Sequence, residues 1–497
     1  MNKVLAEDPK LLGTSQPQAL YILFFAELWE RFSFYGMRAL LVLYMTSELL
    51  FQDTKAFDVY GIYTALVYAA PVICGYLADN YLGNRKAIYL GGIIIILGHF
   101  CLALPFQKSL FYGLAFIIVG TGFFKANVTS LLGQFYEKMD ARRDAGFTLF
   151  YMGINLGACL APLVCGYVGK VFGWHYGFGI AGVGMLFGML VLLKGSDKLG
   201  SKGNPPSKTI LKKPLGFGFT PYRLIVIGSF VSVGLFSLCL HYYHVMSHFL
   251  NIFGVLTLIW VFSIAYRCNA EERKSIFTLL IMLLFFMAFW AGFEQAGSSI
   301  NFFTDRHVNR YIFGWEVPAP WFLSIPPFFV ITMAPLISAI WVKLGKRKLE
   351  PLPPTKFGLG LLQGGIGFGC LLIGIKTADA QGITSPLWLI LAYFFHASGE
   401  LNLSPVGLSM VTKLSPPRFV SFFMGILFLS VAFGNYLAAF FAKIFSVPKS
   451  PLPANDKLGS LISFSGTFEF LIYFLIGASI IMFLISPFMR KTFEKHQ

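Results

Sequence analysis

Apolar runs of about 20 residues recur along the whole chain, and this pattern limits the possible folds more than any other feature. A helix of that length crosses about 30 Å of hydrocarbon. A transmembrane barrel would instead need alternating segments of about 10 residues. Only 12% of the residues are charged and 56% are hydrophobic, whereas about 25% of a soluble domain is charged. The chain is therefore predicted to be an all-α polytopic membrane protein.

Glycine, proline and charged residues divide the apolar runs into fourteen predicted transmembrane helices. The longest polar stretch, residues 194–214, follows the sixth helix and is rich in Gly, Pro, Ser and Lys, which is typical of a linker. The predicted helices span residues 18–46, 57–79, 87–105, 109–136, 145–172, 175–194, 221–243, 246–267, 275–303, 320–343, 356–376, 386–413, 419–446 and 461–489.

The net charge of +16 is distributed unevenly between the predicted loops. With the N-terminus inside, the inside segments carry 27 Lys and Arg and the outside loops carry 9. This asymmetry predicts that both termini are cytoplasmic. The basic loops are therefore interpreted as orientation signals, and no nucleic-acid partner is expected. The first residues lack the apolar region and cleavage site of a signal peptide.

Cysteine and histidine give no pattern that predicts a metal site. Six of the seven cysteines lie in apolar spans and no CxxC occurs, so they are interpreted as small buried hydrophobes. His241, His244 and His248 have a helix-like spacing that a metal site could use, but they fall in a polar turn between the seventh and eighth predicted helices. No metal and no cofactor is therefore expected.

Ionisable residues at membrane depth are the most informative feature for function. Each costs at least about 2.5–3.5 kcal/mol at the centre of a spanning helix, so it needs a partner or a watery cavity. Too many lie in too few helices for all of them to be static pairs between helices. They are Glu27, Glu30, Arg31, Arg38, Lys125, Glu294, Glu400 and, nearer the outer end of the last predicted helix, Glu469.

The first predicted helix presents several of these groups on one face. Positions 27, 30, 31, 34 and 38 share one helical stripe, and Tyr35 flanks it. At 1.5 Å per residue, the two ends of the stripe lie roughly 16 Å apart in depth. The stripe therefore follows a pathway and does not form one compact catalytic centre.

The count of deep charges predicts proton binding. Without Glu469 there are four deep carboxylates and three cations, so three ion pairs leave one carboxylate over. A desolvated carboxylate without a partner takes up a proton. This is the chemistry that a proton-coupled carrier needs, and a carboxylate is the expected proton carrier because no histidine lies among these groups.

Five separated motifs resemble those of the proton-dependent oligopeptide transporter family of the major facilitator superfamily. The resemblance covers residues 18–490, and the motifs follow one another in the family's order. They are AELWERFSFYGMRALLVLYM (26–45), GYLADNYLGNRK (75–86), FYMGINLGACLAP (150–162), FEQAGSSINFFTDRHVNR (293–310) and GELNLSPVGLSMVTKLSP (399–416).

The resemblance implies a facilitator fold with two six-helix bundles, rocking alternating access, and two extra helices between the bundles. It places an N-terminal bundle at 1–194, a cytoplasmic linker at 195–220, the extra pair at 221–267 and a C-terminal bundle at 268–497. It also assigns roles to residues. The resemblance implies that Glu27, Glu30 and Arg31 form the proton-coupling group. It implies an outer gate in which Arg38 pairs with Glu294 and an inner gate in which Lys125 pairs with Glu400. The residues implied to line the pocket are Tyr35, Tyr68, Asn155 and Trp290.

Three positions depart from the family's pattern. Phe34 replaces a tyrosine, Pro326 stands where many members have an asparagine, and Leu427 stands where the family often has a tryptophan of the pocket. These changes remove polar and aromatic groups from peptide recognition and leave the charged groups in place. A more apolar pocket is therefore expected.

The sequence predicts a proton-coupled symporter for small peptides or peptide-like zwitterions in a bacterial inner membrane. Its expected partners are the cargo, protons driven by their gradient, and the lipid bilayer. A carrier of another small organic ion or amino-acid derivative stays open as the nearest alternative. An intramembrane enzyme would need a compact nucleophile or metal constellation, which the sequence does not show. A channel would usually show a repeated filter or ring-forming segment, and the two-half organisation with ExxER argues against it.

Overall fold

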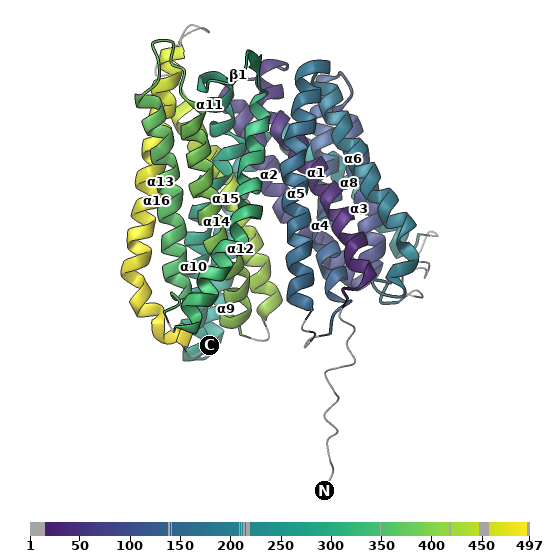
Figure 1. Ribbon diagram of the computed structural model, residues 1–497. Helices are drawn as coiled ribbons and strands as arrows, with labels where there is room; N and C mark the ends of the chain where they lie inside the picture. Colours follow the sequence, from purple (N-terminus) through teal and green to yellow (C-terminus); the bar gives the residue numbers. More distant parts are fainter. Residues whose placement is uncertain are drawn as a thin grey trace.

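Fourteen helices of 19 to 38 residues run along one common direction in the computed structural model (Figure 1). The structure describes residues 15–137, 140, 142–207, 209, 211, 214, 219–347, 349–416, 419–446 and 457–494. We call the end of the molecule at which the first long helix begins and the last one ends the inner end, and the opposite end the outer end. The prediction of an all-α polytopic fold with fourteen long helices is confirmed.

The first bundle is formed by six consecutive helices, seen on the right in Figure 1. Gly83, at φ +71°, ends a short π-helical turn, η2 (Ala78–Leu82), and Gly173, at φ +110°, joins two helices directly, because glycine tolerates positive φ. The six helices are α1 (Gln18–Ser47), α2 (Asp53–Leu77), α3 (Asn84–Leu102), α4 (Gln107–Gly133), α5 (Arg143–Phe172) and α6 (Trp174–Lys194).

The second bundle contains a broken helix. The sequence predicts one helix over 275–303, but the structure has α10 (Ala270–Phe293), a 3₁₀ turn η4 (Glu294–Gly297) and α11 (Ser299–His307). The remaining elements are the hairpin β1 (Tyr311–Ile312) and β2 (Trp315–Glu316), the 3₁₀ segment η5 (Ala319–Ser324), and the helices α12 (Ile325–Lys346), α13 (Pro353–Lys376), α14 (Pro386–Leu414), α15 (Val420–Ser446) and α16 (Lys457–Glu494).

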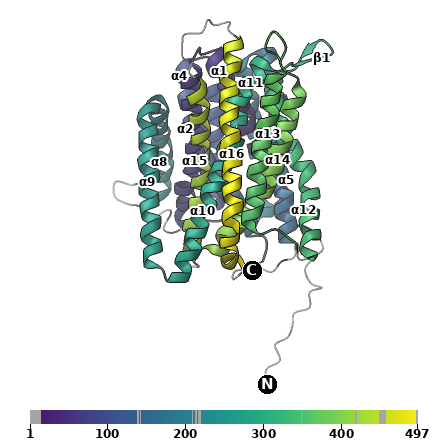
Figure 2. The same ribbon diagram turned by 90° about the vertical axis from the view of Figure 1, so that its left-hand side faces the viewer.

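The extra pair, α8 (Pro221–His241) and α9 (Tyr243–Arg267), lies at one side of the molecule, as Figure 2 shows. Thr220 caps the start of α8, and Asn269 and Glu272 form a capping box at the start of α10. Within the described part of the predicted linker, η3 (Ser196–Leu199) follows α6, and Arg85 donates to the carbonyl of Gly200 at 2.7 Å.

Twelve spans of the described chain are long and apolar enough to cross a membrane, judged by length and hydropathy alone. The two long helices outside this set are α1 and α14. Glu27, Glu30, Arg31 and Arg38 lie on α1, and Glu400 lies on α14. The two helices with the least favourable composition therefore carry five of the eight predicted deep charges.

Candidate functional site

Glu27, Glu30 and Arg31 form a buried cluster on the inner half of α1. All three are at most 2% exposed. The Arg31 guanidinium forms ion pairs with both carboxylates; its Nε lies 3.2 Å from Glu27 Oε1, and it also contacts Glu30 Oε2. Glu27 Oε2 and Glu30 Oε1 have no hydrogen-bond partner in the described structure. One cation therefore serves two carboxylates, and each carboxylate keeps one bare oxygen that a proton could occupy.

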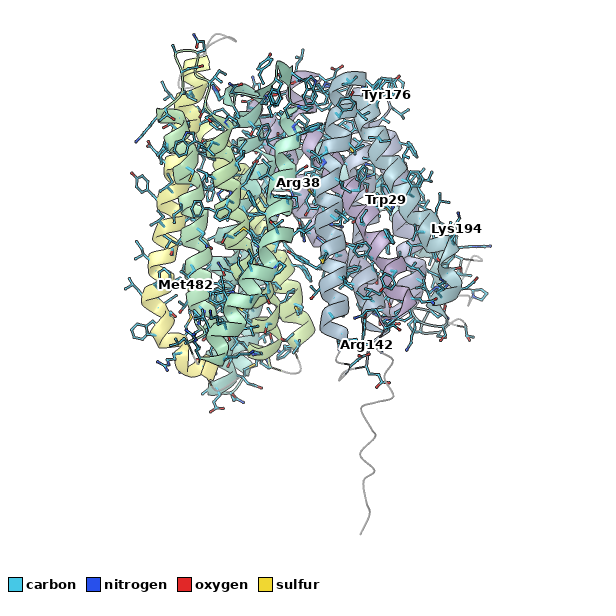
Figure 3. The ribbon with its side chains drawn as sticks, viewed as in Figure 1. Trp29, Arg38, Arg142, Tyr176, Lys194 and Met482 are labelled. Atoms are coloured by element: carbon cyan, nitrogen blue, oxygen red, sulfur yellow. The ribbon has the colours of Figure 1, made fainter. Side chains whose placement is uncertain are left out.

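Arg38 and Glu294 form a buried ion pair that joins the two bundles. Arg38 lies on α1 and Glu294 opens the 3₁₀ turn η4, and they are 8% and 3% exposed. Arg38 Nε also donates to the hydroxyl of Tyr60 on α2 at 2.5 Å. Figure 3 shows Arg38 between the bundles, in the outer half of the molecule. The break at η4 places the Glu294 carboxylate at this junction.

Three further ion pairs join the bundles at the outer end, and the sequence analysis missed them. Their cations had been counted only as loop charges that indicate orientation. Because the partners are far apart in the sequence, no local spacing connects them. The pairs are Arg306 with Asp53 at 2.6 Å, Lys443 with Asp58 at 2.7 Å and Lys170 with Glu316 at 2.8 Å. We call these three pairs the outer rim pairs.

The hairpin pair Lys170–Glu316 provides a small pH-dependent contribution to stability. The hydrogen bond from Lys170 lowers the pKa of Glu316 below its usual value of 4.5. A lowered folded-state pKa stabilises the protein above pH 4.5, and this contribution is lost as the pH falls through the folded-state pKa. Both side chains are about a third exposed, so the pair is worth about 0.2–1 kcal/mol.

We therefore expect Lys170→Gln to lower the melting temperature slightly and equally at pH 7 and pH 5.5. The difference from the wild type should shrink as the pH falls below 4.5 and through the lowered pKa of Glu316, because protonation of Glu316 removes the pair. Differential scanning fluorimetry across this pH range measures the difference. A gap that widens in acid would contradict the assigned pair.

A central cavity of about 100 Å³ lies just inside the Arg38–Glu294 pair and is lined by both bundles. The first bundle contributes Tyr35 and Arg38 from α1 and Asn155 from α5. Trp290, Glu294, Pro326 and Glu400 come from the second bundle. The wall therefore combines carboxylates, a guanidinium, an amide and aromatic rings, which can contact a zwitterion with an apolar body.

Lys125 and Glu400 are not paired with each other in this structure. The Lys125 ammonium lies 3.9 Å from the ring centroid of Tyr68, a cation–π contact. Glu400 accepts a hydrogen bond from the Tyr151 hydroxyl at 3.4 Å. Among the described residues, neither group has an ion-pair partner of opposite charge. One cation and one carboxylate of the predicted set therefore have no ion-pair partner among the described residues in this conformation.

A larger cavity of about 840 Å³ separates the bundles towards the inner end. Asn155 lines both this inner cavity and the central one, so the two meet there. The inner cavity extends along the first half of α5, from Thr148, and reaches Lys356 near the start of α13 and Lys413 near the end of α14. The molecule is therefore held closed at the outer end by ion pairs and is open at the inner end.

Three of the predicted pocket residues do not line the central cavity. Phe34 is 2% exposed, and its ring lies beneath the Arg31 guanidinium. Leu427, on α15, is also 2% exposed and belongs to the hydrophobic core. Tyr68 lies under Lys125. Glu469, on α16, lies apart from the charged groups of α1, with the Ser465 hydroxyl 3.5 Å from its Oε1. Within the described ranges, no three His, Cys, Asp or Glu side chains come together as a metal site.

Comparison with known proteins connects this geometry to a family. The model of the POT family matches residues 85–458. The chain is 36% identical over 489 residues to the uncharacterized transporter YclF of Bacillus subtilis, covering 96% of this chain and 95% of the relative. It is 36% identical over 449 residues to the peptide transporter YePEPT of Yersinia enterocolitica, covering 85% and 86% of the two chains.

Solved structures give the same result. A crystal structure of the peptide transporter POT in complex with sulfate superposes with a TM-score of 0.82 at 35% identity and covers 97% of both chains. A POT family transporter in complex with 5-aminolevulinic acid superposes with a TM-score of 0.80 at 32% identity and covers 95% and 96%. The chain therefore belongs to the POT family, the proton-dependent oligopeptide transporters of the major facilitator superfamily.

Proposed function

We propose that this chain is a proton-coupled symporter that imports small peptides, such as di- and tripeptides, or peptide-like zwitterions by alternating access. The observation that carries the proposal is the central cavity. Both bundles line it, the Arg38–Glu294 pair closes it on the outer side, and the inner cavity opens from it. A cavity closed on one side and open on the other is what a carrier needs at one stage of its cycle.

Cargo recognition follows from the charges that face or adjoin the central cavity. A zwitterion presents an ammonium and a carboxylate at its two ends. Glu400 lines the cavity without a cationic partner in the described structure, so it is proposed to bind the ammonium. Lys125, held over Tyr68, is the proposed partner of the cargo carboxylate. In the conformation that is closed at the inner end, Lys125 and Glu400 are proposed to pair.

Coupling to protons is assigned to the Glu27–Glu30–Arg31 cluster. Because one guanidinium serves two buried carboxylates, protonation of one carboxylate leaves the other fully paired. The cluster can therefore hold one proton without leaving an uncompensated buried charge, which would be costly. The proton gradient then supplies the driving force, and no cofactor enters the proposal.

Orientation and domain limits complete the proposal. The loops that connect the helices at the inner end carry most of the Lys and Arg, which supports a cytoplasmic inner end with both termini inside. The bacterial inner membrane is the proposed location. The proposed units are the bundle at 1–194, the linker at 195–220, the extra pair at 221–267 and the bundle at 268–497.

Proteoliposomes containing the purified protein test the proposed function. They should accumulate a labelled dipeptide when the outside is more acidic than the inside, and accumulation should stop when a protonophore removes the gradient. Empty liposomes are the control. Equal accumulation with and without the gradient would contradict proton coupling.

A compact amino-acid derivative is the second candidate cargo. The central cavity has a volume of only about 100 Å³, and Pro326 supplies a wall without a polar side chain. The similar transporter solved with 5-aminolevulinic acid supports cargo of this size. Competition for dipeptide uptake by 5-aminolevulinic acid and by dipeptides of increasing size distinguishes the two candidates.

The apolar wall of the cavity predicts a preference among dipeptides. Proline lacks a backbone N–H and a polar side chain, whereas one hydrogen bond to a charged group is worth about 1.5–3 kcal/mol, or roughly tenfold or more in affinity. We expect Leu- and Phe-containing dipeptides to compete better than Ala-Ala in the wild type. Pro326→Asn should narrow that difference in a competition series.

Leu427→Trp is the matched comparison for this substitution. Because Leu427 is buried in the core and does not line the cavity, a tryptophan there should lower the melting temperature through overpacking. It should not restore the binding of polar dipeptides. If Ala-Ala already competes as well as Phe-containing dipeptides in the wild type, the apolar wall has no influence on selection.

A further inference from the structure

A groove between α10 and α16 at the inner end is separate from the transport pathway. Its volume is about 550 Å³. It lies between the start of α10 and the last turns of α16, whereas the inner and central cavities lie between the two bundles. Figure 2 shows these two helices in the second bundle, with the end of α16 at the inner end of the molecule.

The groove changes from cationic to apolar along its length. Arg273 and Lys274 line its inner end, and Phe277 and Ile281 continue the same face of α10. From Arg273 to Ile281 the helix rises eight residues, or about 12 Å. A pair of cations near the start of α10, followed by an apolar wall of that depth, matches a phospholipid headgroup above its acyl chain.

The neighbouring carboxylates do not line the groove. Glu272 is part of the capping box, where its Oε2 accepts from the Asn269 backbone N–H at 3.3 Å. Neither Glu271 nor Glu272 is among the residues that line the groove. The lining of the groove therefore contains cations and no anion.

The two cations have different surroundings. Arg273 donates to the carbonyls of Ala265 at 3.2 Å, Tyr266 at 3.1 Å and Cys268 at 3.2 Å, which fixes its guanidinium at the α9–α10 connection. Lys274 is exposed at the groove. Arg273 therefore has a structural role besides its charge, and Lys274 is the position at which the charge can be tested alone.

We propose that this groove binds an anionic phospholipid of the inner leaflet, with Arg273 and Lys274 at the phosphate and Phe277, Ile281, Ile485 and Phe488 along an acyl chain. Basic pockets between transmembrane helices at the membrane surface recognise anionic headgroups. The complementarity of charge at one end and of apolar surface at the other selects a lipid over a free anion. The site is independent of the cargo, so it stands whether or not the proposed transport activity holds.

Thermal stability of the purified protein in detergent tests the proposal. Dioctanoyl phosphatidylglycerol should raise the melting temperature of the wild type with a saturating dependence on concentration. Dioctanoyl phosphatidylcholine, which has the same chains and no net charge, should give a much smaller shift. Inorganic phosphate should give none.

Variants assign the binding to the groove. Lys274→Gln should weaken the apparent affinity for phosphatidylglycerol about fivefold, since one cation near an anionic surface is removed. Lys194→Gln is the matched control, because Lys194 is an exposed lysine at the end of α6, outside the groove (Figure 3). Ile281→Trp should weaken binding by filling the apolar part while it keeps both cations.

Three outcomes of these measurements would contradict the proposed lipid site. Equal shifts with the two lipids would show binding without headgroup recognition and overturn it. An unchanged response in both Lys274→Gln and Ile281→Trp would place the lipid elsewhere. A shift with inorganic phosphate equal to that with phosphatidylglycerol would show an anion site and not a lipid site.

Discussion

Glu30→Gln is expected to abolish proton-driven accumulation of cargo while leaving counterflow intact. Glu30 is fully buried and shares Arg31 with Glu27. Glutamine keeps the shape of the side chain but cannot take up a proton. Arg31 remains paired with Glu27, so the substitution leaves no uncompensated cation. Exchange of labelled for unlabelled cargo needs no net proton movement, so it should continue.

Accumulation under an inward proton gradient and counterflow without a gradient measure the two halves of this prediction. Glu469→Gln is the matched control, because it removes a carboxylate on α16 that lies apart from the cluster. The control should accumulate cargo as the wild type does. Accumulation by Glu30→Gln at the wild-type level would move the proton to another carboxylate, with Glu27→Gln as the next variant to measure.

Arg38→Ala should disrupt transport far more than the loss of an outer rim pair. The Arg38–Glu294 pair is buried, so its removal leaves the Glu294 carboxylate without its cation. An unpaired buried charge costs about 3–5 kcal/mol, at least about a hundredfold in an equilibrium constant. Closure of the outer end should therefore become unfavourable, and uptake should fall to a small fraction of the wild-type rate.

Control variants distinguish the loss of the Arg38–Glu294 gate from the effect of removing any charged residue at the outer end. Arg306→Ala removes an outer rim pair whose side chains are about a third exposed, and should cost about 0.2–1 kcal/mol. The charge swap Arg38→Glu with Glu294→Arg should recover part of the uptake. Spin labels at positions 104 and 313, on exposed outer residues of the two bundles, should report a wider outer mouth in Arg38→Ala. Unchanged distances would exclude a gating role for the pair.

The existence of the long helices could be predicted from the sequence because membrane solvation imposes a length and a composition on each span. The break at Glu294 could not, since WAGFEQAGSSINFF contains no proline and keeps an apolar pattern through the 3₁₀ turn. The hairpin at Tyr311–Glu316 was missed as well. Its turn residues, Phe313 and Gly314, have φ values of +50° and +78°, and a phenylalanine gives no signal for such a turn.

The buried charges of the candidate site could be predicted from the sequence, whereas the ion pairs at exposed helix ends could not. The buried charged groups of α1 stand out in the sequence because a charged side chain inside a membrane-spanning helix is energetically unfavourable unless it has a partner or a watery cavity. Asp53 and Arg306 are separated by 253 residues and lie at helix ends, where charges are common. Lys125 and Glu400 are a different case. The structure has the conformation that is closed at the outer end, whereas their proposed pairing belongs to the conformation that is closed at the inner end.

The closed outer end combines contacts that respond differently to dissolved ions. The outer rim pairs are partly exposed, and dissolved salt weakens the attraction between exposed charges. Arg38 and Glu294 are shielded from the solution, so their attraction persists in concentrated salt. A higher salt concentration would thus weaken the outer rim pairs and leave the buried Arg38–Glu294 pair largely unchanged. The rate at which the outer mouth reopens would then depend on the salt concentration at the outer end.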